Sequence, residues 1–150
     1  MKKLFRLLYG ALDNRYKAEI NPNTSEGRVV FRRLRARNFL DNLKGKRIIE
    51  IGPKSGLDSK HSMSLEPREL TMVDLPSKSD RVLEWLSKIQ SLGNAKYIET
   101  NIQYMSQSDF EKLGQYDLVW CTGVLYHNQE QLRLIRRLFD LCDLNGRIVL

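Results

Sequence analysis

Residues 48–56 read "IIEIGPKSG", an apolar run that ends at a glycine and is followed by a second glycine four residues later. The run has the composition of a buried strand, although it carries an acid, Glu50, near its end. Gly52 allows the backbone to bend sharply and to approach a ligand without interference from a Cβ atom. Gly56 stands where a helix would begin, and free N–H groups there favour a negatively charged ligand group. We therefore expect this turn to contact a ligand.

The chain that follows alternates between strand and helix patterns. The expected strands are residues 47–51, 69–75, 95–100, 116–121 and 146–150, and the expected helices are residues 57–65, 79–93 and 130–142. This alternation predicts an α/β fold, a doubly wound and mostly parallel sheet with helices on both faces and right-handed crossovers. In the helix over 130–142, one side would carry Leu132, Ile135, Leu138, Phe139 and Cys142.

Length and composition indicate one globular domain. The chain has 150 residues, of which 41% are hydrophobic and 29% charged, and no stretch approaches the roughly 18–20 apolar residues that span a bilayer. Cys121 and Cys142 are far apart and lack metal-ligand spacing, so we expect reduced, buried thiols in a cytoplasmic protein. Two histidines are too few for a zinc site with these cysteines, and no metal is expected.

Positive charge is concentrated in the first third of the chain. Residues 1–47 contain 13 Lys and Arg against 4 Asp and Glu, whereas residues 48–150 contain 12 against 14. We expect a basic helical extension over 1–46 and a ligand-binding domain over 47–150. A basic block could attract nucleic acid, anionic lipid or a phosphorylated substrate, or it could be a solvated helical face.

Two ligand types fit the turn after the first strand. A dinucleotide site requires G-x-G-x-x-G, but Lys54 replaces the middle glycine and no glycine stands three residues after it. Glu50 would also repel a pyrophosphate. The acid is better explained by a ligand that carries a positive amino group, and a nicotinamide enzyme is disfavoured.

The segment "EIGPKSG" resembles the first motif of the class I S-adenosylmethionine-dependent methyltransferases, acid-x-Gly-x-Gly-x-Gly. Glu50, Gly52 and Gly56 match this pattern, and Lys54 departs from it. The resemblance implies a Rossmann-like sheet in the order 3-2-1-4-5. It also implies that the turn, with Pro53 and Lys54, wraps the methionine part of S-adenosylmethionine, and that Glu50 lies near its ammonium and sulfonium groups.

The ends of the second and third strands supply further candidates for this cofactor. Asp74, with Leu75 beside it, ends the second strand 22 residues after Gly52, where an acid can accept hydrogen bonds from a ribose diol. In the family, a polar residue after the third strand often bonds the adenine amino group and an apolar neighbour packs on the ring. Asn101 and Ile102 match these positions loosely.

The stretch "YDLVWCTGVLYH" (116–127) resembles a family segment in which a strand is followed by Gly-x-Leu-x-His. In a 3-2-1-4-5 sheet this segment faces the first turn across the switch point. Thr122 and Gly123 are therefore expected to line the cofactor, and Tyr126 and His127 the acceptor. Histidine is a residue type that can act as a general base at neutral pH, so His127 is the candidate base and O-methylation is favoured. Alternatively, His127 orients the following loop.

The acceptor is not readable from the sequence. A small molecule or a glycan is favoured, RNA remains open, and the basic helices could cover the site and favour an anionic acceptor. Family members usually have two strands beyond the fifth, so we expect this domain to be truncated after strand five, with a possible homo-oligomer through that edge. The alternative to an enzyme is a non-catalytic binding or scaffold module that has kept the fold.

Overall fold

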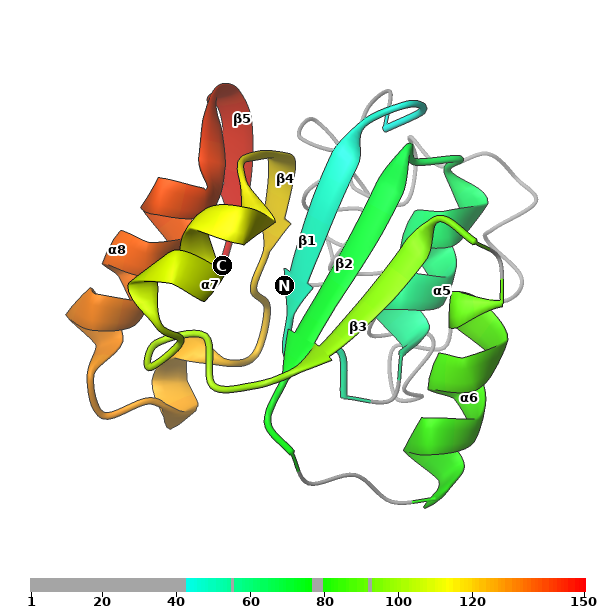
Figure 1. The fold of residues 1–150 in the computed structure, drawn as a ribbon, viewed down its shortest axis with the longest axis horizontal. Helices are drawn as coiled ribbons and strands as arrows, with labels where there is room; N and C mark the ends of the chain where they lie inside the picture. Colours follow the sequence, from blue (N-terminus) through cyan, green and yellow to red (C-terminus); the bar gives the residue numbers. More distant parts are fainter. Residues whose placement is uncertain (1–42, 55, 77–79, 92) are drawn as a thin grey trace, which may run out of the picture. The chain divides into compact units, whose positions relative to one another are not determined.

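A computed structural model describes residues 43–54, 56–76, 80–91 and 93–150 (Figure 1). The helical extension expected over 1–46 therefore lies almost entirely outside the described residues. The elements, labelled as in Figure 1, are β1 (Arg47–Ile51), α5 (Leu57–Ser64), β2 (Glu69–Asp74), α6 (Asp80–Gln90), β3 (Ala95–Glu99), α7 (Gln107–Leu113), β4 (Tyr116–Trp120), the 3₁₀ helix η1 (Leu125–His127), α8 (Gln131–Leu141) and β5 (Cys142–Val149).

The five strands form one parallel sheet in the order β3-β2-β1-β4-β5. The predicted α/β class, the parallel pairing and the strand order are all confirmed. Because the strands are parallel, their carboxyl ends meet at one edge, where ligands bind in such sheets. Backbone bonds continue the ladder past two strand ends at that edge, since Gly52 N–H donates to the Val73 carbonyl and Thr100 N–H to the Asp74 carbonyl, both at 2.8 Å.

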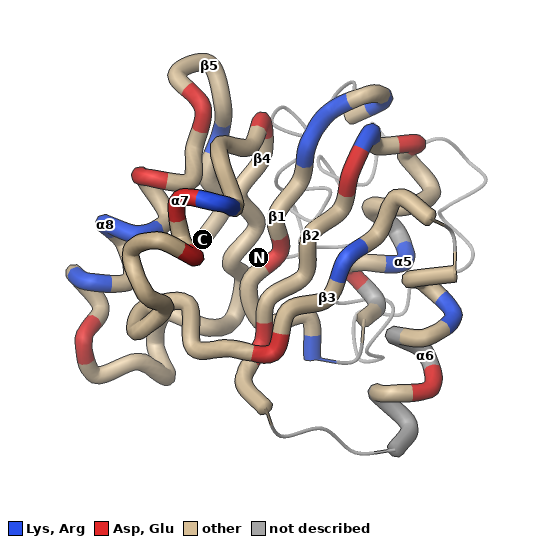
Figure 2. The backbone as a smooth tube through the Cα atoms, in the orientation of Figure 1, with Lys and Arg blue, Asp and Glu red and all other residues tan. Residues whose placement is uncertain are grey.

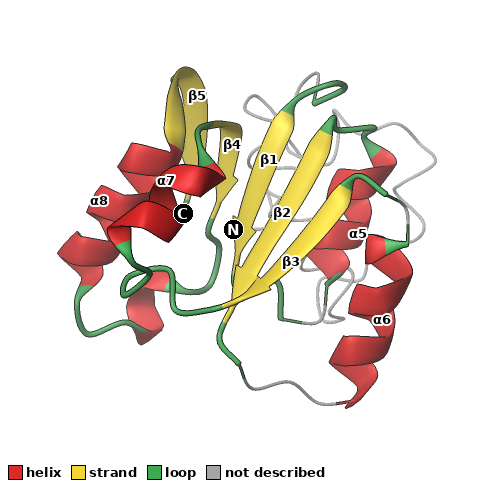
Figure 3. Cartoon of the chain, in the orientation of Figure 1, coloured by secondary structure: helices red, strands yellow, loops and turns green. Residues whose placement is uncertain are grey.

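Helices cover both faces of the sheet (Figure 3). Alternate residues of β1 point to opposite faces. Ile49 and Ile51 pack on the face that α7 and α8 cover, with Phe110, Leu134 and Leu138 from those helices. Glu50 lies on the other face, where a residue of α5 hydrogen-bonds it. This alternation places Glu50 on one side of the sheet and its neighbours Ile49 and Ile51 on the other.

Helix α7 is missing from the sequence-based expectations. It has only seven residues and buries just Phe110 and Leu113, too few apolar positions to show a helical period. Its start nevertheless carries a recognisable cap, because the Ser106 side chain accepts a hydrogen bond from the Asp109 N–H at 3.2 Å. A serine followed three residues later by an acid resembles the capping box that marks helix starts, and that pattern could have identified the helix.

The buried side of α8 agrees with the predicted one only in part, since Leu138 is buried as expected. Leu134, Leu138 and Leu141 are buried, whereas Leu132 and Phe139 are 82% and 66% exposed. Leu132 and Phe139 were predicted wrongly because the helix carries two apolar arcs, and the residues of each arc are spaced as one side of a helix requires. The arc that reaches β4 and β5 is the one that tertiary packing selects.

The end of α8 also differs from expectation. The helix stops at Leu141, and Cys142 already belongs to β5, where it pairs with Tyr116. The next regular pair is Leu118 with Arg147, so residues between them bulge out of the ladder. Both cysteines are free thiols. Cys121 is buried as expected, which raises its pKa to about 12, whereas Cys142 is only half-buried. The proposed association through the outer edge of β5 stays a prediction.

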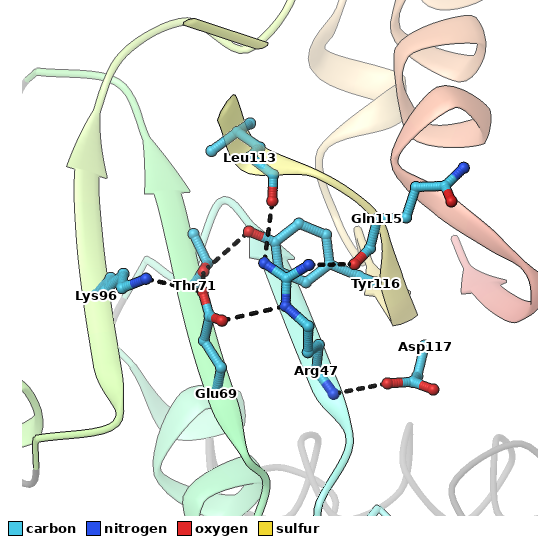
Figure 4. Close-up of polar contacts among 8 residues, drawn as sticks. All are labelled: Arg47, Glu69, Thr71, Lys96, Leu113, Gln115, Tyr116 and Asp117. Carbon is cyan, nitrogen blue, oxygen red and sulfur yellow. Dashed lines mark hydrogen bonds and ion pairs between the residues drawn. The ribbon is translucent and has the colours of Figure 1, made fainter. Parts of the chain in front are cut away.

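A polar network joins the amino-terminal ends of the strands (Figure 4). The Arg47 guanidinium donates to the Glu69 carboxylate at 3.1 Å and to the carbonyls of Gln115 and Leu113 at 2.6 and 3.0 Å. It also lies over the Tyr116 ring, 4.4 Å from the ring centre. One side chain therefore ties together β1, β2, the end of α7 and the start of β4.

Charge in the described part of the chain is mixed. Figure 2 shows basic and acidic residues interspersed over the helices and strands, without a block of one sign. This agrees with the near balance of 12 basic and 14 acidic residues over 48–150. The basic excess of the chain belongs to its first third. Any charge preference of a site at the sheet therefore depends on the individual side chains that line it.

Candidate functional site

A cavity of about 110 Å³ lies at the carboxyl ends of β1, β2 and β3. It is bounded by the turn after β1, the end of β2 and the loops that follow β3 and β4. Of the residues expected to bind a cofactor, five line it together, namely Gly52, Asp74, Leu75, Asn101 and Ile102. The remaining lining residues are Ile51, Val73, Thr100, Gln103, Val124, Asn128 and Leu134.

The turn after β1 has an unusual backbone. Gly52 and Gly56 have φ angles of 72° and 74°, and Lys54 lies between them at 49°. All three are left-handed, a conformation that glycine adopts readily and other residues adopt at a cost. The Pro53 carbonyl accepts a hydrogen bond from Gly56 N–H at 2.7 Å, which closes the turn before α5 begins. The left-handed conformation at position 54 thus explains why the family pattern has a glycine where this chain has a lysine.

Gly52 is also required by close packing. A Cβ atom at this position would lie 2.5 Å from the Cγ2 atom of Val124, a distance that real Cβ contacts do not reach. Val124 belongs to the loop after β4, so the expected approach of that loop to the first turn is present. This contact closes the cavity on the side of the turn.

Asp74 stands at the end of β2 with its carboxylate beside the turn. One carboxylate oxygen accepts a hydrogen bond from Leu75 N–H at 2.8 Å, and the other accepts from Lys54 N–H at 3.4 Å. The second distance is long for an N–H···O bond. Asp74 therefore contacts the first turn from the end of β2, and it also lines the cavity.

Asn101 and Ile102 form the wall next to β3. Ile102 is 4% exposed and belongs to the core cluster. The Asn101 side-chain oxygen accepts a hydrogen bond from Gln103 N–H at 3.1 Å, a local turn that is typical of asparagine. An apolar surface and an amide side by side can accommodate a planar heterocycle that has polar edges.

Glu50 lies outside the cavity. It is 2% exposed and accepts a hydrogen bond from the Ser59 hydroxyl at 2.5 Å, on the sheet face that α5 covers. The bond links the end of β1 to the first turns of α5 and so helps to shape the glycine turn between them. A direct contact between Glu50 and a cationic ligand stays a prediction.

Four further candidates belong to the loop after β4. Thr122, Gly123, Tyr126 and His127 do not line the cavity. Tyr126 is 71% exposed, and the rings of Tyr126 and His127 lie 4.2 Å apart on η1. These two side chains form a small exposed surface directly beside Val124, which does line the cavity. Their proposed roles toward an acceptor stay predictions.

Seven of the lining residues were not predicted from the sequence, and three of these, Gln103, Val124 and Asn128, contact another loop. Each of the three stands within two residues of a predicted site residue, and none has a side chain that indicates chemistry by itself. Gln103 is nevertheless 2% exposed, and its amide forms hydrogen bonds with Asn128. Such a pairing depends on two loops meeting in space, so no local pattern could have identified it.

A larger hollow of about 560 Å³ lies between β3 and α7 and contains none of the predicted site residues. Its charged side chains are paired with each other. Glu69 binds both Arg47 and Lys96, at 3.1 and 3.2 Å, and Lys112 binds Asp109 at 2.7 Å. Because each of these charges has a partner within the hollow, we favour the smaller cavity as the functional site.

Two kinds of feature are absent from the residues that the structure describes. No helix among them combines the length and the apolar character needed to cross a membrane. No group of three or more His, Cys, Asp or Glu side chains in the same part of the chain is placed to hold a metal ion.

Comparisons with known proteins agree with this geometry. A family model described as "Methyltransferase domain" matches residues 24–150. The chain is 24% identical over 112 residues to a tRNA U34 carboxymethyltransferase of Campylobacter concisus, covering 73% of this chain and 36% of the relative. It is 31% identical over 114 residues to a ubiquinone biosynthesis O-methyltransferase of Marinobacter nauticus, covering 74% and 47%.

Solved structures show the same fold. A methyltransferase from Thiobacillus denitrificans, determined in complex with S-adenosyl-L-homocysteine, aligns with a TM-score of 0.59 at 18% identity, over 99% of this chain and 54% of its own. The chain spans between about a third and a half of the length of the curated relatives cited above. The sheet order and the matched family model together show that the chain belongs to the class I S-adenosylmethionine-dependent methyltransferases.

Proposed function

We propose that the chain binds S-adenosylmethionine at the cavity and the adjoining glycine turn, and that it belongs to an enzyme that transfers the methyl group to an oxygen acceptor. One observation carries the proposal. Gly52, Asp74 and Asn101 come from three separate strand ends and line a single cavity. These are the positions that a cofactor with a methionine end, a ribose and an adenine would need.

The nucleoside part fits the residues present. Asp74 accepts hydrogen bonds from the ribose hydroxyls, because a carboxylate oxygen can accept more than one donor. Ile102 packs against the adenine ring, and the Asn101 amide bonds its polar edge. The cavity of about 110 Å³ is smaller than the roughly 300–1,000 Å³ of typical ligand sites. The methionine part therefore extends beyond it, along Gly52, Pro53 and Lys54.

When bound, S-adenosylmethionine supplies an electrophilic methyl group on a sulfonium. The work of the protein is then to align the acceptor with that methyl group. Thr122 and Gly123 flank the cofactor, and the exposed pair Tyr126 and His127 faces the acceptor, where His127 takes the proton of a hydroxyl. The O-methyltransferase among the relatives supports an oxygen acceptor.

The class of acceptor is narrowed by the same comparisons. The relatives are named for a tRNA nucleoside and for a ubiquinone precursor, so an RNA or a small hydroxylated molecule is favoured over a glycan. No observation in the site favours the alternative of a non-catalytic module. Incubation with tritiated S-adenosylmethionine and either unfractionated tRNA or a catechol separates the two acceptor classes, and His127→Gln should lower incorporation into the hydroxyl acceptor.

Cofactor binding is tested by calorimetry with S-adenosylhomocysteine. Asp74→Asn should weaken binding by about tenfold to a hundredfold, because hydrogen bonds to a charged acceptor contribute roughly 1.5–3 kcal/mol. The matched control is Glu99→Gln, since Glu99 pairs with Asp74 in the β2–β3 register but does not line the cavity. Equal affinities of Asp74→Asn and wild type would refute the ribose assignment, and a folded wild-type protein that binds nothing would refute the function.

A further inference from the structure

The loops after β3 and β4 are joined by two side-chain amides that bond each other in both directions. Gln103 Nε2 donates to Asn128 Oδ1 at 3.0 Å, and Asn128 Nδ2 donates to Gln103 Oε1 at 2.5 Å. The two residues are 25 positions apart in the sequence, and both line the candidate cavity. Neither was expected to have a role.

The remaining hydrogen-bonding capacity of Gln103 is also committed. Its second side-chain proton goes to the Glu130 carbonyl at 3.0 Å, and its backbone N–H donates to Asn101 Oδ1 at 3.1 Å. Asn128 Oδ1 in addition accepts Glu130 N–H at 2.9 Å. Because Gln103 is 2% exposed and its amide is engaged within the protein, its role is not to hydrogen-bond a ligand. Its effect must pass through the residues that it holds.

Those residues lie at opposite ends of the site. Through Asn101, the pair holds the wall assigned to adenine. Through the Asn128 backbone, whose N–H donates to the Leu125 carbonyl at 3.1 Å, it holds η1, which carries Tyr126 and His127. Val124, at the start of the same loop, packs against Gly52. One continuous set of contacts therefore runs from the adenine wall to the acceptor side.

We propose that the Gln103–Asn128 amide pair is a positioning unit that fixes the adenine wall and the η1 loop relative to each other. This inference rests on the proposed function for its ligand. The pair prearranges both walls before the cofactor enters, so that binding does not have to order two independent loops. The pair is suited to this role, because any shift of one loop would leave the buried Gln103 amide without its partner.

The sharpest test is Asn128→Asp, with Asn128→Leu as the more drastic variant. The carboxyl keeps an oxygen for Glu130 N–H, so the local turn survives, but it sets a second acceptor against Gln103 Oε1. We expect S-adenosylhomocysteine binding to weaken by about tenfold at pH 7, the effect of losing one buried hydrogen bond with its partner left unsatisfied. Gln107→Ala is the matched control, since Gln107 carries an exposed amide in the segment that follows β3. The oxygen of this amide accepts a hydrogen bond from Arg137 of α8.

A pH profile separates positioning from a general structural defect. As the pH falls from about 7 toward about 4.5, the introduced carboxyl begins to take up a proton and can again donate to Gln103. The ratio of the variant and wild-type dissociation constants should therefore narrow. Asp74 and Glu130, the acids on the neighbouring elements, are common to both proteins and cancel in the ratio. A ratio that is constant or widens would overturn the proposal.

Amide hydrogen exchange of the ligand-free protein supplies a readout that is independent of the cofactor. Asn128→Asp and Asn128→Leu should both increase exchange in residues 101–105, in the other loop, as well as around position 128. Increased exchange confined to residues 124–130 would overturn the coupling. A wild-type protein that fails to bind S-adenosylhomocysteine would defeat the proposed function, while the exchange result would still decide whether the pair joins the loops.

Discussion

The two ends of the parallel strands are held in different ways. At the amino-terminal end, Arg47 donates three side-chain hydrogen bonds and stacks on Tyr116 (Figure 4). At the carboxyl end, the first turn is left-handed at Gly52 and Lys54, and a backbone bond of 3.4 Å connects it to Asp74. The comparison teaches that a single charged side chain ties several elements together at the amino-terminal end, while the first turn at the proposed ligand site is shaped by left-handed residues and close packing.

The difference follows from what each end has to do. A paired and partly buried cation such as Arg47 is costly to move, because its partners would lose their hydrogen bonds in a region of low dielectric. A site that admits a ligand has to leave acceptors and backbone N–H groups within reach of it. The predictions below separate these two roles by measuring stability and ligand binding in the same variants.

The largest expected effect is at the amino-terminal end. Arg47→Ala should lower the free energy of unfolding by about 3 kcal/mol, because it removes one donor from Glu69 and one from each of two backbone carbonyls. Binding of S-adenosylhomocysteine by the folded fraction should be unchanged. Urea denaturation and calorimetry measure the two quantities. Lys96→Ala is the control, since Lys96 also binds Glu69 but is largely exposed, and a similar loss in that variant would contradict the central role of Arg47.

Gly52→Ala should affect both quantities. The left-handed backbone and the 2.5 Å approach of Val124 together should cost roughly 2 kcal/mol of stability, and ligand binding should fall with the distorted turn. The double variant Gly52→Ala/Val124→Ala relieves the steric part and should recover a portion of the stability. If the double variant is less stable than the sum of the single losses, the contact with Val124 is not the cause.

The network at the amino-terminal ends of the strands should also make the free energy of unfolding depend on pH in the acidic range. Burial raises the pKa of Glu69, but its hydrogen bonds with Arg47, Lys96 and Thr71 outweigh burial and hold that pKa below its ordinary value. The stabilisation is therefore fully present above the ordinary glutamate pKa of about 4.3 and is lost as the pH falls through the lower folded value.

Thermal denaturation between neutral and acidic pH measures this dependence. Glu69→Gln should be less stable than wild type at neutral pH, by less than Arg47→Ala, and the difference should shrink toward acid. Glu99→Gln provides a control on the adjacent strand. An acid dependence that is identical in wild type and Glu69→Gln would mean that other carboxylates account for it.

The smallest effect is expected at Lys54. Lys54→Gly relieves a left-handed lysine but adds freedom to the unfolded chain, and the net gain in stability should be about 0.5 kcal/mol. Lys60→Gly, at an exposed position inside α5, should instead destabilise by about 1 kcal/mol. Loss of stability in Lys54→Gly would show that the lysine side chain contributes more to the turn than its backbone conformation costs.

Strong local patterns allowed most of the fold to be predicted. The strand β1, the helix α8 and the parallel pairing follow from apolar runs, from helical spacing and from the way in which parallel strands must be connected. The strand order came from the resemblance to the methyltransferase family. The short helix α7 was missed because two buried residues make no period. The buried side of α8 was predicted only in part, because two apolar arcs compete and only the neighbouring strands choose between them.

The residues of the candidate site also divide into those that local patterns could predict and those that they could not. Gly52, Asp74 and Asn101 could be predicted because each follows a strand whose end is fixed by the fold. Gln103, Val124 and Asn128 could not, since their importance arises from contacts between loops that are distant in the sequence. Glu50 was placed correctly at the end of β1, but the sequence did not indicate that Ser59 would hold it on the opposite face.

The sequence by itself determined the α/β alternation, the turn through Gly52 and the order of acid, glycine and strand end, because these depend on periodicity and on backbone conformations that few residues tolerate. Only the tertiary structure decided which side of α8 is buried, that Val124 requires a glycine at position 52, and that Gln103 and Asn128 join the two walls of the cavity. The physical reason is that burial and hydrogen-bond pairing are properties of two segments in contact, and neither segment encodes its partner.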